Sequence, residues 1–266
     1  MPEGHTIHRL ARDHHNWFGG SVVSVASPQG RFSEGADRLD GLKFKRATAH
    51  GKHLFYEFVD DGTKGLWVHI HLGLFGRFRK RKLPPQTPGQ NTRMRLMNDK
   101  RCVDLSGPTR CEVLTHRGRK DVVHRLGPDP LLDEFDAEHF IASLSKRRSA
   151  IGAILLDQSA VAGIGNVYRS ELLFQHRLDP FTPANQLSED TLAALWDTAV
   201  DWLHVGVQTN RIITRFDGGS PRALPKRERL MVYKKRFCIA CDEPITVSTQ
   251  RQRTLYHCPR CQVARI

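Results

Sequence analysis

Four cysteines near the end of the chain constrain its fold more than any other feature of the sequence. Cys238 and Cys241 form one Cys-x2-Cys pair, and sixteen residues later Cys258 and Cys261 form a second. This spacing is typical of a tetrahedral zinc site, in which two tight turns place four thiolates around one ion. Four protein ligands leave no open position for water, so we expect one structural Zn2+ ion. Four cysteines with no common ligand are the alternative.

The segment between the two cysteine pairs alternates between polar and apolar residues, which predicts a β-hairpin. Arg251 and Arg253 fall near the turn of this hairpin. From such a tip an arginine can reach a phosphate or enter a groove of a nucleic acid. A solvated tip is the alternative.

The net charge also favours a nucleic-acid partner. The chain carries +13, and residues 211–266 hold 13 basic but 4 acidic residues. A localised basic field favours a polyanion, nucleic acid before membrane, although a solvated surface is the alternative. No apolar run approaches the ~18 residues that span a bilayer, and no signal-peptide core follows Met1. We therefore expect an intracellular, cytoplasmic and nucleoid-associated protein.

The hydrophobic pattern predicts a multidomain α+β protein. Residues 3–18 repeat apolar side chains at the helical period, and short alternating runs over about 21–115 predict a β-sandwich or barrel. After the turn at 127–130 the pattern becomes helical. Helices are expected over 137–146, 149–157 and 167–175, with a long one that begins after an N-cap at Ser188. The expected domains are a β-sandwich with an N-terminal helix over 1–127, a helical domain over 128–229 and a zinc finger over 230–266.

A glycine-rich connection and one lysine are candidates for phosphate contacts. Gly163-Ile164-Gly165-Asn166 joins two expected helices, and Asn166 is placed to cap the second of them. Backbone amides at such a helix start can bind phosphate, but a plain tight turn is the simpler interpretation. Lys52 opens an expected strand after a glycine, where it can hold a phosphate or help to polarise a sugar. A surface lysine is the alternative.

Two histidines and the N-terminus carry further chemistry. His69 and His71 share one strand face at a spacing that can bind a metal, but because no carboxylate is evident nearby we expect a packed or hydrogen-bonded pair. Removal of Met1 would give Pro2 a secondary amine, which can attack an N-glycosidic carbon and form an iminium, or Schiff base. Glu3 suits the positive end of the helix that follows and can move protons at the sugar.

Five motifs occur along the chain in a fixed order. They are Met1-Pro2-Glu3-Gly4, Gly51-Lys52, His71-Leu72-Gly73-Leu74-Phe75-Gly76, Ala162-Gly163-Ile164-Gly165-Asn166-Val167-Tyr168 and the four-cysteine module. In this order they resemble the motifs of the formamidopyrimidine-DNA glycosylase/endonuclease VIII (Fpg/Nei) family. The resemblance covers essentially the whole chain, and the combination is specific although each motif alone is weak.

The resemblance implies a bifunctional DNA glycosylase/AP lyase of base excision repair. By it, a β-sandwich with a catalytic helix, a helix–two-turn–helix domain and a zinc finger bind damaged DNA, and a monomer is expected. Pro2 would be the nucleophile, Glu3 the proton-transfer residue and Lys52 a further catalytic residue. Phosphates flanking the lesion would be contacted by Lys52, Asn166 and Arg253. Further DNA-binding candidates are His71, Arg251 and the pair Leu74 and Phe75, which match a loop that fills the gap left by a flipped base.

The branch of the family decides the expected substrate. Gly4-His5-Thr6 replaces the Leu-Pro-Glu of the Fpg opening, and residues 99–105 lack the phenylalanine of the guanine-lesion branch. The opening Met1-Pro2-Glu3-Gly4 and the missing phenylalanine favour the endonuclease VIII branch, which prefers oxidised pyrimidines, whereas His5 and Thr6 depart from the pattern of both branches. Residues 214–229 take the place of the lesion-capping loop. The alternatives are an oxidised-purine (formamidopyrimidine or 8-oxoguanine) glycosylase and a non-catalytic zinc protein that binds damaged DNA.

Overall fold

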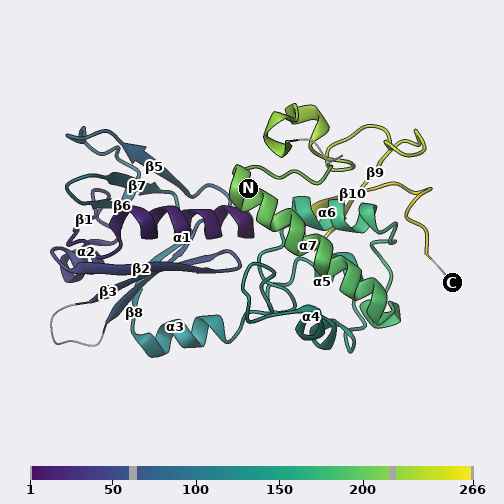
Figure 1. Cartoon of the computed structure of the whole chain (residues 1–266), viewed down its shortest axis with the longest axis horizontal. Helices are drawn as coiled ribbons and strands as arrows, with labels where there is room; N and C mark the ends of the chain where they lie inside the picture. The colour runs from purple at the N-terminus through teal and green to yellow at the C-terminus, as the bar shows by residue number, and fades with distance from the viewer. Residues whose placement is uncertain (1, 60–64, 216–219, 265–266) are drawn as a thin grey trace. The chain divides into compact units, whose positions relative to one another are not determined.

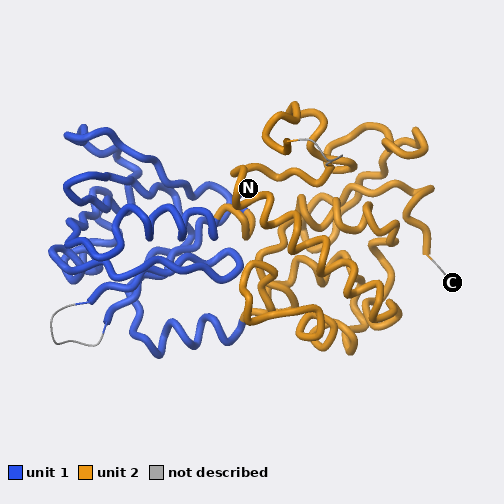
Figure 2. Tube along the Cα trace, viewed as in Figure 1, with its two compact units in different colours: residues 1–2, 7–125 blue, residues 3–6, 126–266 orange. Residues whose placement is uncertain are grey.

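The computed structural model describes residues 2–59, 65–215 and 220–264. The chain divides into two compact units, drawn in different colours in Figure 2. Unit 1 consists of residues 1–2 and 7–125, and unit 2 consists of residues 3–6 and 126–266. The boundary adjoins the turn at 127–130, where the sequence pattern changes. The expected division of the second half into a helical domain and a zinc finger stays a prediction.

Unit 1 contains a β-sandwich, as the short alternating runs predict. Its described residues form two four-stranded antiparallel sheets. One sheet has the order β1 (Ser24–Ala26), β6 (Thr92–Met97), β7 (Cys102–Ser106) and β5 (Arg77–Arg81). The other has the order β2 (Lys43–His50), β3 (His53–Val59), β4 (Leu66–His71) and β8 (Arg110–Leu114). Helix α1 (Gly4–Phe18), which belongs to unit 1 from Ile7 onward, lies between the two sheets in Figure 1.

The core of unit 1 lies between the sheets and α1. The helix contributes Ile7, Ala11 and Phe18, which recur at the helical period. Alternate residues from Leu54 to Phe58 of β3 join the same core. Because strand side chains alternate between faces, β3 presents His53 on the opposite, outer face of its sheet.

Two helices of unit 1 were not predicted from the hydrophobic pattern. They are α2 (Ser33–Leu39) and α3 (His116–Val123), and α3 has no buried residue. The side chain of Thr115 caps α3 by accepting a hydrogen bond from the Gly118 amide. The Arg119 guanidinium lies 4.6 Å from the centre of the Trp67 ring. Because α3 has no apolar face to bury, cation–π contacts of this kind help to hold it on the outer face of the sheet.

Unit 2 combines helices with a β-hairpin. Its helices are α4 (Ala137–Leu144), α5 (Ile151–Ile154), α6 (Asn166–Gln175) and α7 (Glu189–Thr209), with short 3-10 turns η1 (Ala184–Gln186), η2 (Pro221–Ala223) and η3 (Lys226–Glu228). Strands β9 (Thr246–Gln250) and β10 (Arg253–His257) form the predicted hairpin. The predicted N-cap is confirmed, because the Ser188 hydroxyl accepts a hydrogen bond from the Thr191 amide. No helix in the described part of the chain is long and apolar enough to cross a membrane.

One predicted helix is much shorter than expected. The segment 149–157 contains a single helical turn, α5, followed by tight turns. The Asp157 carboxylate accepts from the Ser159 amide at 3.0 Å, and the Gln158 side chain accepts from the Gly163 amide at 3.1 Å. Side chains that bond to nearby backbone amides in this way compete with the helical hydrogen bonds. The chain therefore leaves the helix and reaches α6 through a compact loop.

Candidate active site

Glu3, which follows Pro2, is held at the start of α6. Its side chain is fully buried, and its two carboxylate oxygens accept hydrogen bonds from backbone amides. Oε1 accepts from Val167 at 2.9 Å, and Oε2 accepts from Gly165 at 3.0 Å. Glu3 thus directly precedes its own helix, α1, as the sequence suggested, and its carboxylate also lies at the positive end of α6. Pro2, which is half-buried, is bonded directly to this anchored residue.

Glycine at position 165 permits this close approach. A Cβ atom at Gly165 would lie 2.3 Å from the Glu3 Cδ atom, well inside van der Waals contact. Gly4, next in the chain after Glu3, donates its amide to the Gly163 carbonyl at 2.8 Å. The glycine-rich connection is therefore a tight turn shaped to receive the N-terminal residues.

The predicted role of Asn166 as a helix cap is wrong. The N-cap position of α6 is Gly165. The first amides of α6 donate to the Glu3 carboxylate, which therefore occupies the position where the sequence suggested a bound phosphate. The Asn166 side chain instead donates to the Thr254 carbonyl at 2.8 Å and accepts from Arg169 at 2.6 Å. Asn166 therefore links α6 to the β-hairpin, and its contact with a phosphate stays a prediction.

Two buried charges on α6 were not found from the sequence. Arg169 is fully buried, and desolvation lowers its pKa to about 10. Glu171 is also fully buried, and its oxygens accept from the amides of residues 231–233 at 2.7–2.9 Å. The Thr214 hydroxyl donates to the same carboxylate at 2.5 Å. Eight of the ten residues of α6 are buried, and two of them are charged, so this helix lies at the centre of unit 2. The mixture of polar and apolar residues in its sequence was the only sign that charged side chains would be buried here.

In unit 1, Lys52 lies in the turn between β2 and β3. This turn contains Gly51 at φ +56°, and Lys52 is half-buried. Three histidines stand in register across adjacent strands, with His50 of β2 opposite His53 of β3 and His53 opposite His71 of β4. Burial lowers the pKa of His53 to about 3 and also lowers that of His71, and the positive charge of Lys52 adds to both shifts. The lowered pKa values favour neutral imidazoles at His53 and His71, close to Lys52.

His69 and His71 are both hydrogen-bonded, as expected, but to different partners and not to each other. His69 Nδ1 lies 3.0 Å from the Glu112 carboxylate of β8, and His69 Nε2 lies 2.8 Å from His53 Nδ1. His71 instead bonds to the Thr109 hydroxyl at 2.8 Å. The sequence interpretation missed the carboxylate because Glu112 is 43 residues from His69 and is brought near by strand pairing.

Leu74 and Phe75 project from the loop between β4 and β5. They are 45% and 81% exposed, whereas most large apolar side chains of unit 1 are buried. The loop turns at Gly73, whose φ of +63° favours glycine. Two exposed apolar residues on a tight loop are suited to insertion into an apolar gap, which stays a prediction for this loop.

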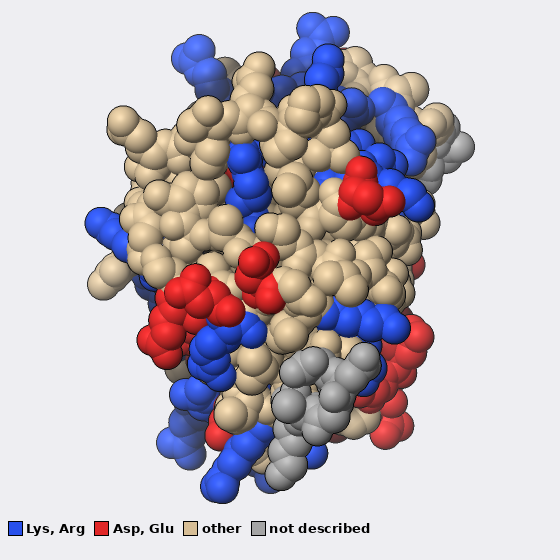
Figure 3. Space-filling model, turned by 90° about the vertical axis from the view of Figure 1, so that its left-hand side faces the viewer, with Lys and Arg blue, Asp and Glu red and all other residues tan. Residues whose placement is uncertain are grey.

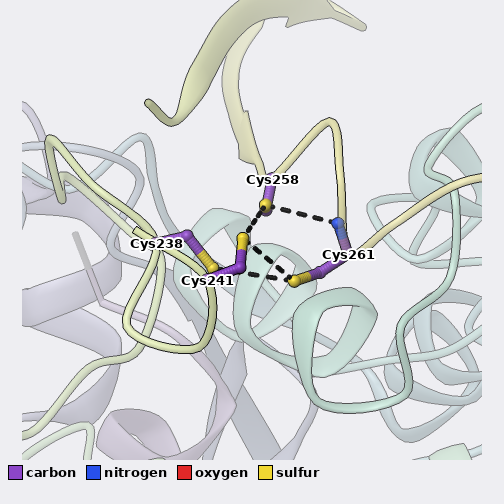
Figure 4. A group of neighbouring side chains, drawn as sticks. All are labelled: Cys238, Cys241, Cys258 and Cys261. Carbon is purple, nitrogen blue, oxygen red and sulfur yellow. Dashed lines mark hydrogen bonds between the residues drawn. The ribbon is translucent and has the colours of Figure 1, made fainter. Parts of the chain in front are cut away.

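The four cysteines of the C-terminal module converge, as Figure 4 shows. Their sulfur atoms lie within 4.8 Å of one another, with Sγ–Sγ distances of 3.8 Å for Cys238–Cys261, 3.5 Å for Cys241–Cys258 and 3.4 Å for Cys241–Cys261. A tetrahedral Zn2+ with Zn–S bonds of about 2.3 Å requires sulfurs about 3.8 Å apart. The donor set and its spacing therefore fit one metal ion held by four thiolates.

The β-hairpin between the cysteine pairs ends in a turn at Arg251 and Gln252, both of which have positive φ. Arg251 forms an ion pair with Asp157 at 3.5 Å, so this arginine contacts the helical part of unit 2. Arg253 begins β10, is exposed, and has no ion-pair partner among the residues that the structure describes. Of the two predicted arginines, Arg253 is the one whose charge is available for a ligand.

Basic residues are distributed unevenly over the surface. Strand β5 contributes four of them within five residues at the edge of its sheet: Arg77, Arg79, Lys80 and Arg81. In Figure 3 lysine and arginine side chains gather along the upper and lower edges of the face drawn, and acidic side chains form smaller groups between them. The expected capping loop over 214–229 includes residues 216–219, which lie outside the described residues.

Comparison with known proteins gives consistent results over the whole chain. The family profile of the formamidopyrimidine-DNA glycosylase N-terminal domain matches residues 1–112, and that of the formamidopyrimidine-DNA glycosylase H2TH domain matches residues 126–217. Relatives named Endonuclease 8 1 from Mycobacterium tuberculosis and Mycobacterium bovis are 43% identical, covering 98% of this chain and 100% of theirs. A formamidopyrimidine-DNA glycosylase from Laribacter hongkongensis is 30% identical over 98% of both chains.

The fold agrees with solved structures of similar proteins. The MutM (Fpg) protein of Thermus thermophilus has a TM-score of 0.78 and 26% identity, with 98% of each chain covered. A Lactococcus lactis Fpg variant bound to DNA containing Fapy-dG has a TM-score of 0.80 at 23% identity, with 98% of this chain and 99% of the other covered, which shows a common fold. The predicted fold class is confirmed. Members of the matched family are DNA glycosylases with AP lyase activity, and the chain belongs to the formamidopyrimidine-DNA glycosylase/endonuclease VIII family.

Proposed function

We propose that this protein removes oxidised bases, mainly pyrimidines, from DNA through a Schiff base at the Pro2 nitrogen and then nicks the strand by β,δ-elimination. The observation that carries this proposal is the anchoring of Glu3 by the amides of Gly165 and Val167. A residue fixed so firmly, with an N-terminal proline bonded to it, gives the amine a defined position. Catalysis by a nucleophile gains most from such positioning.

The proposed reaction begins once Met1 has been removed. The Pro2 nitrogen forms a bond to C1′ of the damaged nucleotide, the bond from C1′ to the base breaks, and the base leaves with a proton. Opening of the sugar ring gives an iminium, and loss of a C2′ proton then breaks the C3′–O bond. A second elimination breaks the C5′–O bond, and water hydrolyses the iminium to return the amine. With Met1 attached, the same nitrogen is a tertiary amide and cannot attack.

Glu3 would move protons at the sugar in this reaction. In the structure both of its oxygens accept hydrogen bonds, which favours the ionised carboxylate. An ionised group adjacent to the nucleophile can accept a proton from the amine or the sugar and can stabilise the cationic iminium.

Contacts with DNA are proposed for residues of both units. Lys52 of unit 1, with Asn166 and Arg253 of unit 2, would contact phosphates flanking the lesion, and His71 and Arg251 would make further contacts with the DNA. Leu74 and Phe75 would fill the space left when the damaged nucleotide leaves the stack. Support for a damaged-DNA partner comes from the similar Lactococcus lactis proteins, which were crystallised with Fapy-dG and abasic-site DNA. We propose that the protein acts as an intracellular monomer.

One Zn2+ ion is proposed for the four-cysteine cluster. The bound zinc would have a structural role and no open coordination site for substrate or water, because all four ligands come from the protein. The residues 230–266 around it would form the finger that presents Arg253.

The substrate preference follows from the proposed branch. Identity is 43% to the relatives named Endonuclease 8 1, and it is 30–34% to those named formamidopyrimidine-DNA glycosylase. This difference supports the endonuclease VIII branch and hence oxidised pyrimidines. An oxidised-purine glycosylase is the second candidate, supported by the likeness to Fpg structures.

Borohydride trapping on a duplex with one abasic site tests the proposed chemistry. The processed wild type should form a covalent complex, whereas a protein with an N-terminal extension and a Pro2→Ala variant should form far less. Absence of a complex with verified, processed wild type would contradict both glycosylase candidates and leave the non-catalytic binder. Trapping of the extended protein at the wild-type level would place the nucleophile on another residue.

A panel of duplexes then separates the two glycosylase candidates. We expect faster single-turnover release of an oxidised pyrimidine than of 8-oxoguanine from otherwise identical duplexes. The reverse order would assign the protein to the oxidised-purine candidate.

A further inference from the structure

A continuous chain of hydrogen bonds crosses the outer face of the sheet that carries Lys52. The Glu112 carboxylate of β8 lies 3.0 Å from His69 Nδ1 of β4. His69 Nε2 then lies 2.8 Å from His53 Nδ1 of β3. His53 immediately follows Lys52 in the chain, so the hydrogen bonds run from an edge strand to the Lys52 turn.

The chemistry of the groups fixes the direction of this chain. An ionised carboxylate only accepts, so Nδ1 of His69 must carry the hydrogen and donate to Glu112. A neutral imidazole has one donor and one acceptor nitrogen, so Nε2 of His69 accepts. The hydrogen between the two rings therefore belongs to His53 Nδ1. As a result, Nε2 of a neutral His53 is an acceptor.

The surroundings keep both imidazoles neutral. Burial is the largest cause that lowers the pKa of His53, to about 3, and His69, His71, His50 and Lys52 lower it further. Burial also lowers the pKa of His69. Glu112 opposes this shift, whereas Arg110 and Arg125 add to it. Burial, together with the positive charges nearby, thus outweighs Glu112 and favours neutral imidazoles at physiological pH, which the direction of the chain requires.

The chain of hydrogen bonds is exposed at Glu112 and buried at His69. Glu112 is 41% exposed and also receives a hydrogen bond from Arg110 at 3.4 Å. It borders a surface hollow of about 350 Å3 that Glu34 and Arg38 also line. His69 is 2% exposed, and its ring stacks on that of Phe55 with centres 5.0 Å apart. The middle of the chain, at His69, is therefore shielded from water, whereas Glu112 can exchange with solvent.

We propose that Glu112, His69 and His53 are positioning residues for Lys52: they fix Nε2 of His53 as a hydrogen-bond acceptor that orients the lysine ammonium toward a DNA phosphate. This inference rests on the proposed function. A neutral imidazole can hold an ammonium without cancelling its charge, whereas a carboxylate at the same place would neutralise it. Lys52 would thus be both ordered and fully charged toward the phosphate.

The substitution Glu112→Gln tests the relay because its electrostatic effect alone has the opposite sign. Removing a negative charge should strengthen binding to a polyanion. The relay predicts weaker binding, because a glutamine can donate as well as accept and no longer fixes the direction of the hydrogen bonds. We expect the dissociation constant for an abasic-site duplex to rise about tenfold, the scale of one hydrogen bond to a charged group. The slope of affinity against salt should stay unchanged, since Lys52 keeps its charge.

Glu34→Gln is the matched control, because Glu34 is exposed and borders the same hollow. It should bind the duplex as tightly as the wild type or slightly more tightly. Equal or tighter binding by Glu112→Gln would overturn the relay. Weaker binding by both variants to the same extent would also overturn it, because the effect would then not depend on the histidines.

Nitrogen-15 NMR of the histidine side chains gives a readout that does not depend on DNA. In the wild type at neutral pH, His53 and His69 should both carry hydrogen on Nδ1 and none on Nε2. In Glu112→Gln, a fraction of His53 should shift to the Nε2-protonated form, while the buried His14 signal reports an intact fold. Hydrogen on Nε2 of wild-type His53 would overturn the relay. A failed borohydride trapping experiment would instead contradict the proposed glycosylase function and leave this NMR result valid.

Discussion

The substitution Glu3→Gln should destabilise unit 2 through the start of α6. The carboxylate accepts from Val167 with one oxygen and from Gly165 with the other, at 2.9 and 3.0 Å. A glutamine keeps one oxygen and replaces the second with an NH2 group. Whichever orientation it takes, one buried backbone amide faces another donor.

The expected loss of unfolding free energy is about 3 kcal/mol. An unsatisfied buried amide costs about 1–3 kcal/mol. Loss of a negative charge at a buried helix N-terminus costs up to about 2 kcal/mol. Glutamine avoids part of the cost of burying a carboxylate, which offsets some of the sum. Glu189→Gln, in the exposed first turn of α7, is the control and should lose about 0.5 kcal/mol.

Urea unfolding of the processed protein, followed by circular dichroism, measures both variants under the same conditions. A loss for Glu3→Gln no larger than that for Glu189→Gln would refute the reasoning. It would mean that Glu3 does not cap α6 in solution and that the position of Pro2 is not fixed in this way.

Four further outcomes are expected. Glu171→Gln should lose about 3 kcal/mol of unfolding free energy in urea, because at least one buried amide donor loses its acceptor, and an unchanged midpoint would contradict this. Cys258→Ser, or chelation of the metal, should weaken DNA binding while the helical dichroism signal persists; equal affinity after verified metal loss would contradict it. Lys52→Ala and Arg253→Ala should each weaken binding and reduce the slope of log affinity against log salt by about one, and an unchanged slope would make these residues bystanders. Burial lowers the pKa of His14 to about 3 in the folded protein, so its stabilising contribution is present above about pH 6.5 and is lost as pH falls toward 3. Unfolding free energy should therefore fall by about 3 kcal/mol from pH 7 to pH 4.5 through this group, and His14→Phe should flatten that dependence in urea titrations at both pH values.

Features that depend on short-range spacing were predictable from the sequence. The two Cys-x2-Cys pairs converge as their spacing requires, and the alternation between them gives the hairpin. Ser188 caps α7 because a serine directly before an acidic, apolar-periodic segment satisfies a backbone amide locally. In these cases the partners are close in sequence, so no knowledge of the fold is needed.

Features that depend on strand pairing or on distant segments were not predictable. The acceptor for the α6 amides comes from Glu3, more than 160 residues away, which is why Asn166 was wrongly expected to cap this helix. Glu112 reaches His69 only because β8 pairs with β4. Glu171 could not be distinguished from a surface acid, because its backbone partners lie about 60 residues further along the chain.

The close packing of Gly165 against Glu3 has a consequence for how this protein can change in evolution. Because a Cβ at position 165 would overlap the Glu3 carboxyl group, the two positions should not accept substitutions independently. Gly165→Ala alone should displace the glutamate, whereas the same change beside a shorter side chain at position 3 should be tolerated better in the fold. A saturation library should therefore reveal strong pairwise epistasis between residues that are far apart in the gene.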